Sequence, residues 1–312
     1  MPKVTRARSG SCRMCSKVGP LEAGHILPSF VYRWLKDTSA TGYLRTGENP
    51  NLRIQDGVKR HWFCRDCENQ MSRAEKAFAE ELFPLVVGER PAPYPHGPWL
   101  SRFIASVAWR TVMLFSERRD AFDYFTAEQE ALLPAAFERW RAFVHGEAET
   151  PNVHEPHFMP MGLMADYQSD RALPTNINRY TMRSIEIHVA SGATHAFAFV
   201  KMGPAVAIGF IQPPPPDMWV GTCVTLGDGQ VGGRMVVPVQ FLDYIIERAS
   251  KLRSAQRRRS PRQDEKIRKA FEKNLDRAAA SETFRVIDAD VARFGVERVF
   301  SLEDEPEARE VE

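Results

Sequence analysis

The chain has 312 residues, enough for one large domain or two ordinary ones, and its 43% hydrophobic and 26% charged residues are typical of a soluble globular protein. No apolar run approaches the roughly 18 residues that span a membrane. The N-terminal sequence MPKVTRARSG lacks the apolar stretch of a secretory signal. These features argue against a membrane-spanning protein, and a cytoplasmic location is expected.

Charge is distributed unevenly, although the formal net charge is only +2. Residues 1–73 carry 13 Lys and Arg against 6 Asp and Glu, and residues 251–277 carry 11 against 4. From Glu282 onward the balance reverses, with 4 basic against 10 acidic residues. Two basic blocks favour a polyanionic partner. Charge runs are also typical of solvated helix faces, and for 251–277 both interpretations stay open.

The first predicted module covers residues 1–90 and contains two Cys-x-x-Cys pairs. PSFVYRWLKD, after the first pair, has helical spacing. Asp56-Gly57, within NLRIQDGVKRHWF, predicts a β-hairpin with a type I′ turn. The second pair leads into ENQMSRAEKAFAEELF, an amphipathic helix expected to end before Pro84.

The rest of the chain is expected to form a helical segment, a mixed domain and a tail. Residues 88–98 are rich in Pro and Gly and predict a linker. Two helices are expected within 98–150, the second opened by a capping box of Thr126 and Gln129. Residues 175–300 predict an α+β domain of unknown role, with antiparallel strands from SIEIHVAS to GFIQ, a further strand in MWVGTCVTL, and C-terminal helices. An acidic tail follows at 301–312.

Four of the five cysteines, Cys12, Cys15, Cys64 and Cys67, form the two pairs. Without a secretory signal, this pattern predicts a structural zinc site rather than disulfides. The 48 residues between the pairs exceed the usual spacing, so other elements must be inserted between them. Because the second pair opens a helix, a treble-clef arrangement is favoured over a plain zinc ribbon. Cys223 is interpreted as a small buried residue on a strand.

The order of these features resembles the zinc-stabilised HNH endonucleases, the ββα-metal nucleases, over about residues 10–80. A cysteine pair is followed by His25 in GHILP, and the second pair opens a helix. The resemblance implies that His25 is the general base for the water that attacks a phosphodiester. It also implies a catalytic cation, Mg²⁺ or Mn²⁺, separate from the zinc. Glu68 occupies the position after the second pair, where the family often has His or Asn.

These residue types suit that chemistry. Histidine titrates near neutral pH, as a general base requires, and the Glu68 carboxylate is a suitable ligand for a hard cation. Glu75 lies seven residues further on the same predicted helix face, although it is equally interpreted as an exposed helix residue. The basic residues expected to contact nucleic acid, with DNA favoured over RNA, are Arg53, Lys59 and Arg60.

The sequence departs from the family pattern at two positions. Gly24 stands where the family commonly has an aspartate. Glu22 would share the face of Gly24 on a regular strand, but it lies further from His25. The family's middle asparagine has no match, since Asn51 lies thirteen positions before Cys64. Two functions therefore remain open: an HNH-like endonuclease, and a non-catalytic zinc-binding protein that binds nucleic acid or acts as an adaptor. In the second, His25 is a structural residue.

One further histidine pair is close in sequence. His154 and His157 are near enough to share a metal ion, but the sequence offers no third ligand for them.

Overall fold

The computed structural model describes residues 8–47, 49–164, 171–215 and 217–301. The chain divides into two units whose segments alternate along the sequence: Met1–Ser29, Gly57–Pro160 and Ile185–Val237 in the first, and Phe30–Asp56, Met161–Ser184 and Pro238–Glu312 in the second. This grouping differs from the consecutive domains at 1–90, 98–150 and 175–300 expected from the sequence. The acidic tail, apart from Ser301, lies outside the described residues.

The first unit begins with a small antiparallel sheet and a helix. Strands β1 (Arg8–Ser11), β2 (Val18–His25) and β5 (Lys59–Phe63) pair in the order β1-β2-β5. Helix α2 (Arg65–Ala77) follows β5 and continues through a π-helical turn, η1 (Phe78–Leu82), into α3 (Phe83–Val87). The predicted end before Pro84 is wrong. Pro84 sits in the first turn of α3, directly after the π-helical turn, and the helical path continues through it.

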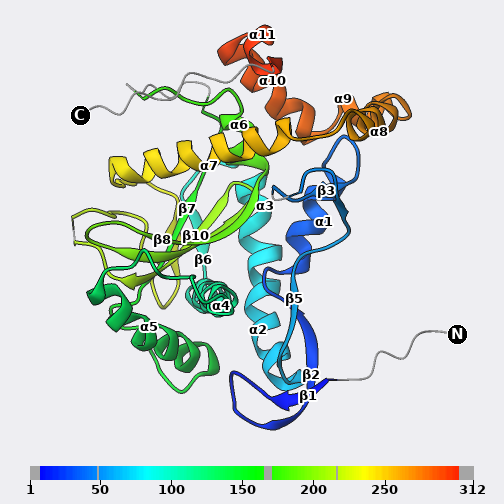
Figure 1. Cartoon of the computed structure of the whole chain (residues 1–312). Coiled ribbons are helices and arrows are strands. Elements are labelled where there is room, and N and C mark those ends of the chain that lie inside the picture. The colour runs from blue at the N-terminus through cyan, green and yellow to red at the C-terminus, as the bar shows by residue number, and fades with distance from the viewer. Residues whose placement is uncertain (1–7, 48, 165–170, 216, 302–312) are drawn as a thin grey trace, which may run out of the picture. The chain divides into compact units, whose positions relative to one another are not determined.

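A larger antiparallel sheet completes this unit, with strands in the order β7-β10-β9-β8. The strands are β7 (Pro156–Pro160), β8 (Ile185–Ser191), β9 (Ala196–Met202) and β10 (Ala205–Gln212). Helices α4 (Trp99–Phe115) and α5 (Ala127–His145) pack on it, and α4 also contacts α2 (Figure 1). The capping box of Thr126 and Gln129 is confirmed. The predicted linker contains β6 (Tyr94–His96), which pairs with β11 (Gly229–Val231).

The cysteine segment shares one hydrophobic core with α4, α5 and the larger sheet. Cys12, Met14 and Cys67 are buried in that core. The ring of Phe63, at the end of β5, lies 5.4 Å from that of Trp109 on α4. The short sheet and α2 are too small to bury their apolar faces alone, and α4 supplies the missing surface.

The second unit is mainly helical. It contains α1 (Ser29–Asp37) from Phe30 onward, β3 (Leu44–Arg45), β4 (Arg53–Ile54), α6 (Ile177–Arg183), α7 (Val239–Arg257), α8 (Pro261–Glu272), α9 (Leu275–Ala279), α10 (Glu282–Phe294) and α11 (Val296–Phe300). The predicted hairpin at Asp56-Gly57 is wrong, because β4 pairs with β3 while β5 pairs with β2. Asp56 and Gly57 instead mark the passage from the second unit to the first.

The coarse fold class is confirmed as α+β, with small antiparallel sheets and helices; the treble-clef arrangement stays a prediction. The predicted strand in MWVGTCVTL is wrong, since only isolated bridges occur at Val220 and Cys223. Throughout the described ranges, no helix has both the length and the apolar character needed to cross a membrane.

Candidate metal centre and adjoining polar site

The four paired cysteines form a cluster that could hold a metal ion. Their Sγ atoms all lie within 4.8 Å of one another. The Sγ atoms of Cys15 and Cys64, one from each pair, are 3.8 Å apart. Cys12 and Cys15 lie in the turn between β1 and β2, and Cys64 and Cys67 lie at the N-terminus of α2. Two segments separated by 48 residues thus converge on one point.

Backbone hydrogen bonds shape the first cysteine turn. The amide of Ser16 donates to the carbonyl of Cys12 over 2.8 Å, and the amide of Cys12 donates to the carbonyl of Lys17 over 2.9 Å. Ser16 adopts a left-handed conformation with φ of 60°. Arg141 of α5 donates through Nη1 to the carbonyl of Met14 over 2.8 Å, which braces the turn from outside.

The surroundings of the cluster shift the pKa values of its thiols in opposite directions. Burial alone would raise the pKa of Cys12, but hydrogen bonds from backbone amides, including that of Cys64, outweigh it and bring the pKa to about 7. Burial raises the pKa of Cys67, and the neighbouring cysteines add to the rise. A metal ion binds the thiolate form, so its binding would release protons from such thiols.

His25 ends β2 opposite β5. The register pairs Gly24 with Arg60 and His25 with Lys59, and it shifts between Glu22 and Gly24. Two steps along β2 therefore match three along β5, which is a β-bulge directly before the histidine. Bulges re-aim side chains and are common beside functional sites.

The carboxylate of Glu68, in the first turns of α2, lies against Gly24. A Cβ built on Gly24 would stand 1.9 Å from Oε1 of Glu68 and 3.0 Å from Oε2. The glutamate therefore occupies the space that a side chain at position 24 would need. Burial raises the pKa of Glu68 to about 7; Arg110 opposes that rise, and Glu75 and Glu22 add to it.

Arg110 of α4 connects the end of β2 to α2. Its side chain is 3% exposed. Nη1 donates to the carbonyl of His25 over 2.9 Å, and Nη2 donates to Oε1 of Glu75 over 2.6 Å. Glu75 is therefore an ion-pair partner with a side chain only 20% exposed, not an exposed helix residue. Sequence reasoning missed Arg110, although a single arginine inside the apolar run IASVAWRTVML was a usable signal.

Two other residues considered as candidates from the sequence, Glu22 and Asn51, have other partners in the structure. Glu22 forms an ion pair with Arg65, with 3.0 Å between Oε1 and Nε. Asn51, in the second unit, bonds the carbonyl of Arg258 and the amide of Ser260, and so has a structural role there. Among the described residues, His25, Glu68 and Glu75 do not form a close group of three ligand atoms.

The basic residues expected at nucleic acid belong to both units. Lys59 is exposed on β5, and Arg60 beside it makes a two-pronged ion pair with Glu117, at 3.0 Å from Nε and 2.8 Å from Nη2 to Oε2. In the second unit, the guanidinium of Arg53 lies 3.7 Å from the centre of the Tyr43 ring. The carboxylate of Glu117 therefore offsets the positive charge that Arg60 would present to a phosphate.

Many basic residues of the block at 251–277 form ion pairs or donate to backbone carbonyls within the second unit. Arg259 bonds Asp264 at 2.7 Å, and Arg268 pairs with Glu265 and Glu272 on its own helix. Such pairs are those of a solvated helix face, which favours the structural interpretation of this block.

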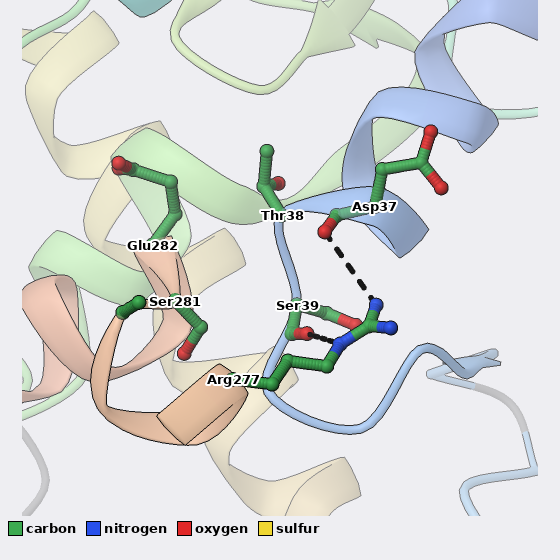
Figure 2. Close-up of a pocket in the computed structure, with 7 residues that line it drawn as sticks. Asp37, Thr38, Ser39, Arg277, Ser281 and Glu282 are labelled. Carbon is green, nitrogen blue, oxygen red and sulfur yellow. Dashed lines mark hydrogen bonds between the residues drawn. The ribbon is translucent and has the colours of Figure 1, made fainter. Parts of the chain in front are cut away.

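A hollow in the second unit is lined by Asp37, Thr38, Ser39, Arg277, Ala280, Ser281 and Glu282 (Figure 2). Arg277 donates to the carbonyls of Ser39 over 3.1 Å and Lys36 over 2.9 Å, where α1 ends. Ser281 caps α10 by accepting from the amide of Phe284. The polar groups around this hollow thus close helix ends, which is a structural role.

Comparison with models of protein families, with curated proteins and with solved structures gives no match to this chain.

Proposed function

We propose that the first unit is a metal-dependent endonuclease of the HNH type, with His25 as general base and zinc in the four-cysteine cluster. The observation that carries the proposal is the contact between Glu68 and Gly24. It places a carboxylate against the residue that precedes His25, which is the position where the sequence lacks the aspartate that the resemblance implies. The order of β2, β5 and α2, with a cysteine pair before β2 and another opening α2, is that expected of a ββα-metal module in treble-clef form.

Zinc is favoured for the cluster because the spacing fits. A tetrahedral ion with Zn–S bonds of about 2.3 Å separates its sulfurs by about 3.8 Å. The Sγ atoms of Cys15 and Cys64 are 3.8 Å apart. Four thiolates leave no open position, so this ion would stabilise the fold rather than take part in the reaction.

In the proposed reaction, His25 and Glu68 would have separate roles. His25 would accept a proton from the attacking water, a role that requires a base titrating near neutral pH. Glu68 would hold Mg²⁺ or Mn²⁺; Mg²⁺ commonly uses one or two protein carboxylates with substrate phosphates completing its shell. A cation bound there would neutralise the charge that develops on the phosphate. Arg110, through the carbonyl of His25 and the carboxylate of Glu75, would hold the strand end against α2.

The second candidate is a zinc-stabilised protein that binds nucleic acid without cutting it. One observation favours it: no third ligand atom joins His25 and Glu68 in a close group within the part of the chain that the structure describes. A metal-dependent cleavage assay on plasmid, linear DNA and RNA separates the two. The endonuclease cuts with Mg²⁺ or Mn²⁺ and is inactive in EDTA, whereas the binder retains nucleic acid without cutting it.

A further inference from the structure

Three potential metal ligands meet at the edge of the larger sheet, in the first unit and outside the four-cysteine cluster. The ligand atoms of Glu155, His157 and Cys223 all lie within 4.8 Å of one another. Oε2 of Glu155 is 3.6 Å from Sγ of Cys223 and 3.9 Å from Nε2 of His157. The sequence suggested His154 as the partner of His157, but the ring of His154 bonds the carbonyl of Phe210 instead.

Backbone pairing explains why these three side chains converge. The amide of Phe158 donates to the carbonyl of Thr222 over 2.8 Å, and the amide of Val224 donates to the carbonyl of Pro156 over 2.9 Å. These bonds flank His157 and Cys223, which form an isolated antiparallel bridge. In such a non-hydrogen-bonded pair the two side chains lie close together on one face. Glu155, two residues before His157, shares that face.

The ring of His157 is fixed with Nε2 toward the other two ligands. Its Nδ1 lies 2.7 Å from Oγ1 of Thr222. The hydroxyl of Thr222 donates its own hydrogen to the carbonyl of Trp219 over 2.8 Å, so Oγ1 accepts from Nδ1–H. Nε2 of the neutral ring then carries a lone pair. A hydrogen bond from the second ring nitrogen is the usual way in which proteins orient a metal-bound histidine.

Packing holds the ring in this orientation. His157 is 4% exposed, and its ring meets that of Phe210 edge-on at 4.8 Å. Glu155 and Cys223, in contrast, are exposed. The site thus has one rigid ligand and two at the surface. Cys223 is not the buried strand residue expected from the sequence.

We propose that Glu155, His157 and Cys223 bind one divalent transition-metal ion of the zinc class. A thiolate, an imidazole and a carboxylate form the mixed donor set that such ions prefer over Mg²⁺. A tetrahedral zinc ion would separate sulfur from carboxylate oxygen by about 3.5 Å and nitrogen from oxygen by about 3.3 Å. The first value matches the structure, and a small movement of the exposed Glu155 side chain supplies the second.

The proposed site differs in kind from the four-cysteine cluster. Three protein ligands leave a fourth position open to water or a small ligand, as in catalytic rather than structural zinc sites. Its residues are separate from those of the proposed nuclease, so failure of either proposal leaves the other standing.

The test is residue-resolved alkylation of Cys223 in the full chain, with zinc added and with Mg²⁺ as the hard-cation control. Zinc should slow alkylation of Cys223 at least tenfold, and Mg²⁺ should not. Glu155→Gln, at an exposed position, should remove the protection, whereas Glu149→Gln, which changes another exposed glutamate six positions earlier in the sequence, should retain it. Total metal should fall by one equivalent per chain in Cys223→Ser. Alkylation unaffected by zinc, protection that persists in Glu155→Gln, or unchanged metal content in Cys223→Ser would each overturn the proposal.

Discussion

Glu68 lies against Gly24 so closely that a Cβ on the glycine would stand 1.9 Å from the glutamate Oε1. The two residues are 44 positions apart and belong to α2 and β2. The absence of a side chain at position 24 is thus matched by the presence of one at 68. Position 24 precedes His25, so a carboxylate from the helix occupies the space of a side chain that the strand itself lacks there.

This relationship predicts that the carboxylate can be exchanged between the two positions. Gly24→Ala should displace the flexible end of Glu68, with little change in melting temperature and at least a tenfold loss of metal-dependent cleavage. Glu68→Ala should lose cleavage as well. The double variant Gly24→Asp/Glu68→Ala should recover part of it, because aspartate then occupies the vacated space. A double variant no more active than Glu68→Ala contradicts the exchange.

The four-cysteine cluster predicts that metal and fold are lost together. Cys12→Ser should lose one metal equivalent and lower the melting temperature of the first unit, because metal-binding free energy at such sites is folding free energy. Cys223→Ser, outside the cluster, should keep the cluster's metal. Mass spectrometry under native conditions and thermal unfolding would measure both effects. A Cys12→Ser protein with full metal content and unchanged melting temperature would rule out the assignment.

The buried ion pair of Arg110 and Glu75 predicts a large effect on stability. Arg110→Met removes the guanidinium and leaves Glu75 without its partner, which should cost about 3 kcal/mol in the free energy of unfolding. The double variant Arg110→Met/Glu75→Gln should recover part of that loss, because it leaves no unpaired charge. Urea denaturation of the single and double variants measures the coupling. Additive effects of the two changes would show that the pair is energetically unimportant.

Loss of the ion pair between Arg60 and Glu117 should strengthen nucleic-acid binding. Glu117→Gln releases Arg60 and removes a negative charge, so affinity for DNA should rise and its dependence on salt should steepen. Lys59→Gln should weaken binding and reduce the salt slope by about one. Glu149→Gln, which also removes one negative charge, serves as the matched control. Equal gains from Glu117→Gln and Glu149→Gln would attribute the effect to net charge alone.

The parts of the fold that the sequence predicted are those with local signals. The helix cap at Thr126, and the strands β8 to β10 with their short connections, depend on residues close in sequence. The predictions that failed concern pairings between segments that are separated along the chain. Nothing near Asp56-Gly57 indicates that β4 would pair with β3 and β5 with β2, because both pairings join segments separated along the chain.

For the candidate site, too, the features predicted from the sequence were local and the missed ones depended on tertiary packing. The spacing of the cysteines suggested their cluster, since two Cys-x-x-Cys pairs are a strong pattern. The Glu68 contact with Gly24 and the arrangement of Arg110 required the register of β2 against β5 and the packing of α4. The group of Glu155, His157 and Cys223 could not be predicted from the sequence. An isolated β-bridge brings its members together, and no strand pattern surrounds Cys223.

We propose His25 as the base of a metal-dependent nuclease. The most direct measurement is cleavage of plasmid, linear DNA and RNA by the purified full chain in Mg²⁺ or Mn²⁺ and in EDTA, beside His25→Ala and the control His61→Gln. His61 lies on β5, with Nδ1 at 3.2 Å from the carbonyl oxygen of Leu21. Cutting should require the cation, fall by about a hundredfold or more in His25→Ala, and persist in His61→Gln, with bound metal and melting temperature unchanged in His25→Ala. Binding without cutting, or equal cutting by His25→Ala, would contradict the proposal.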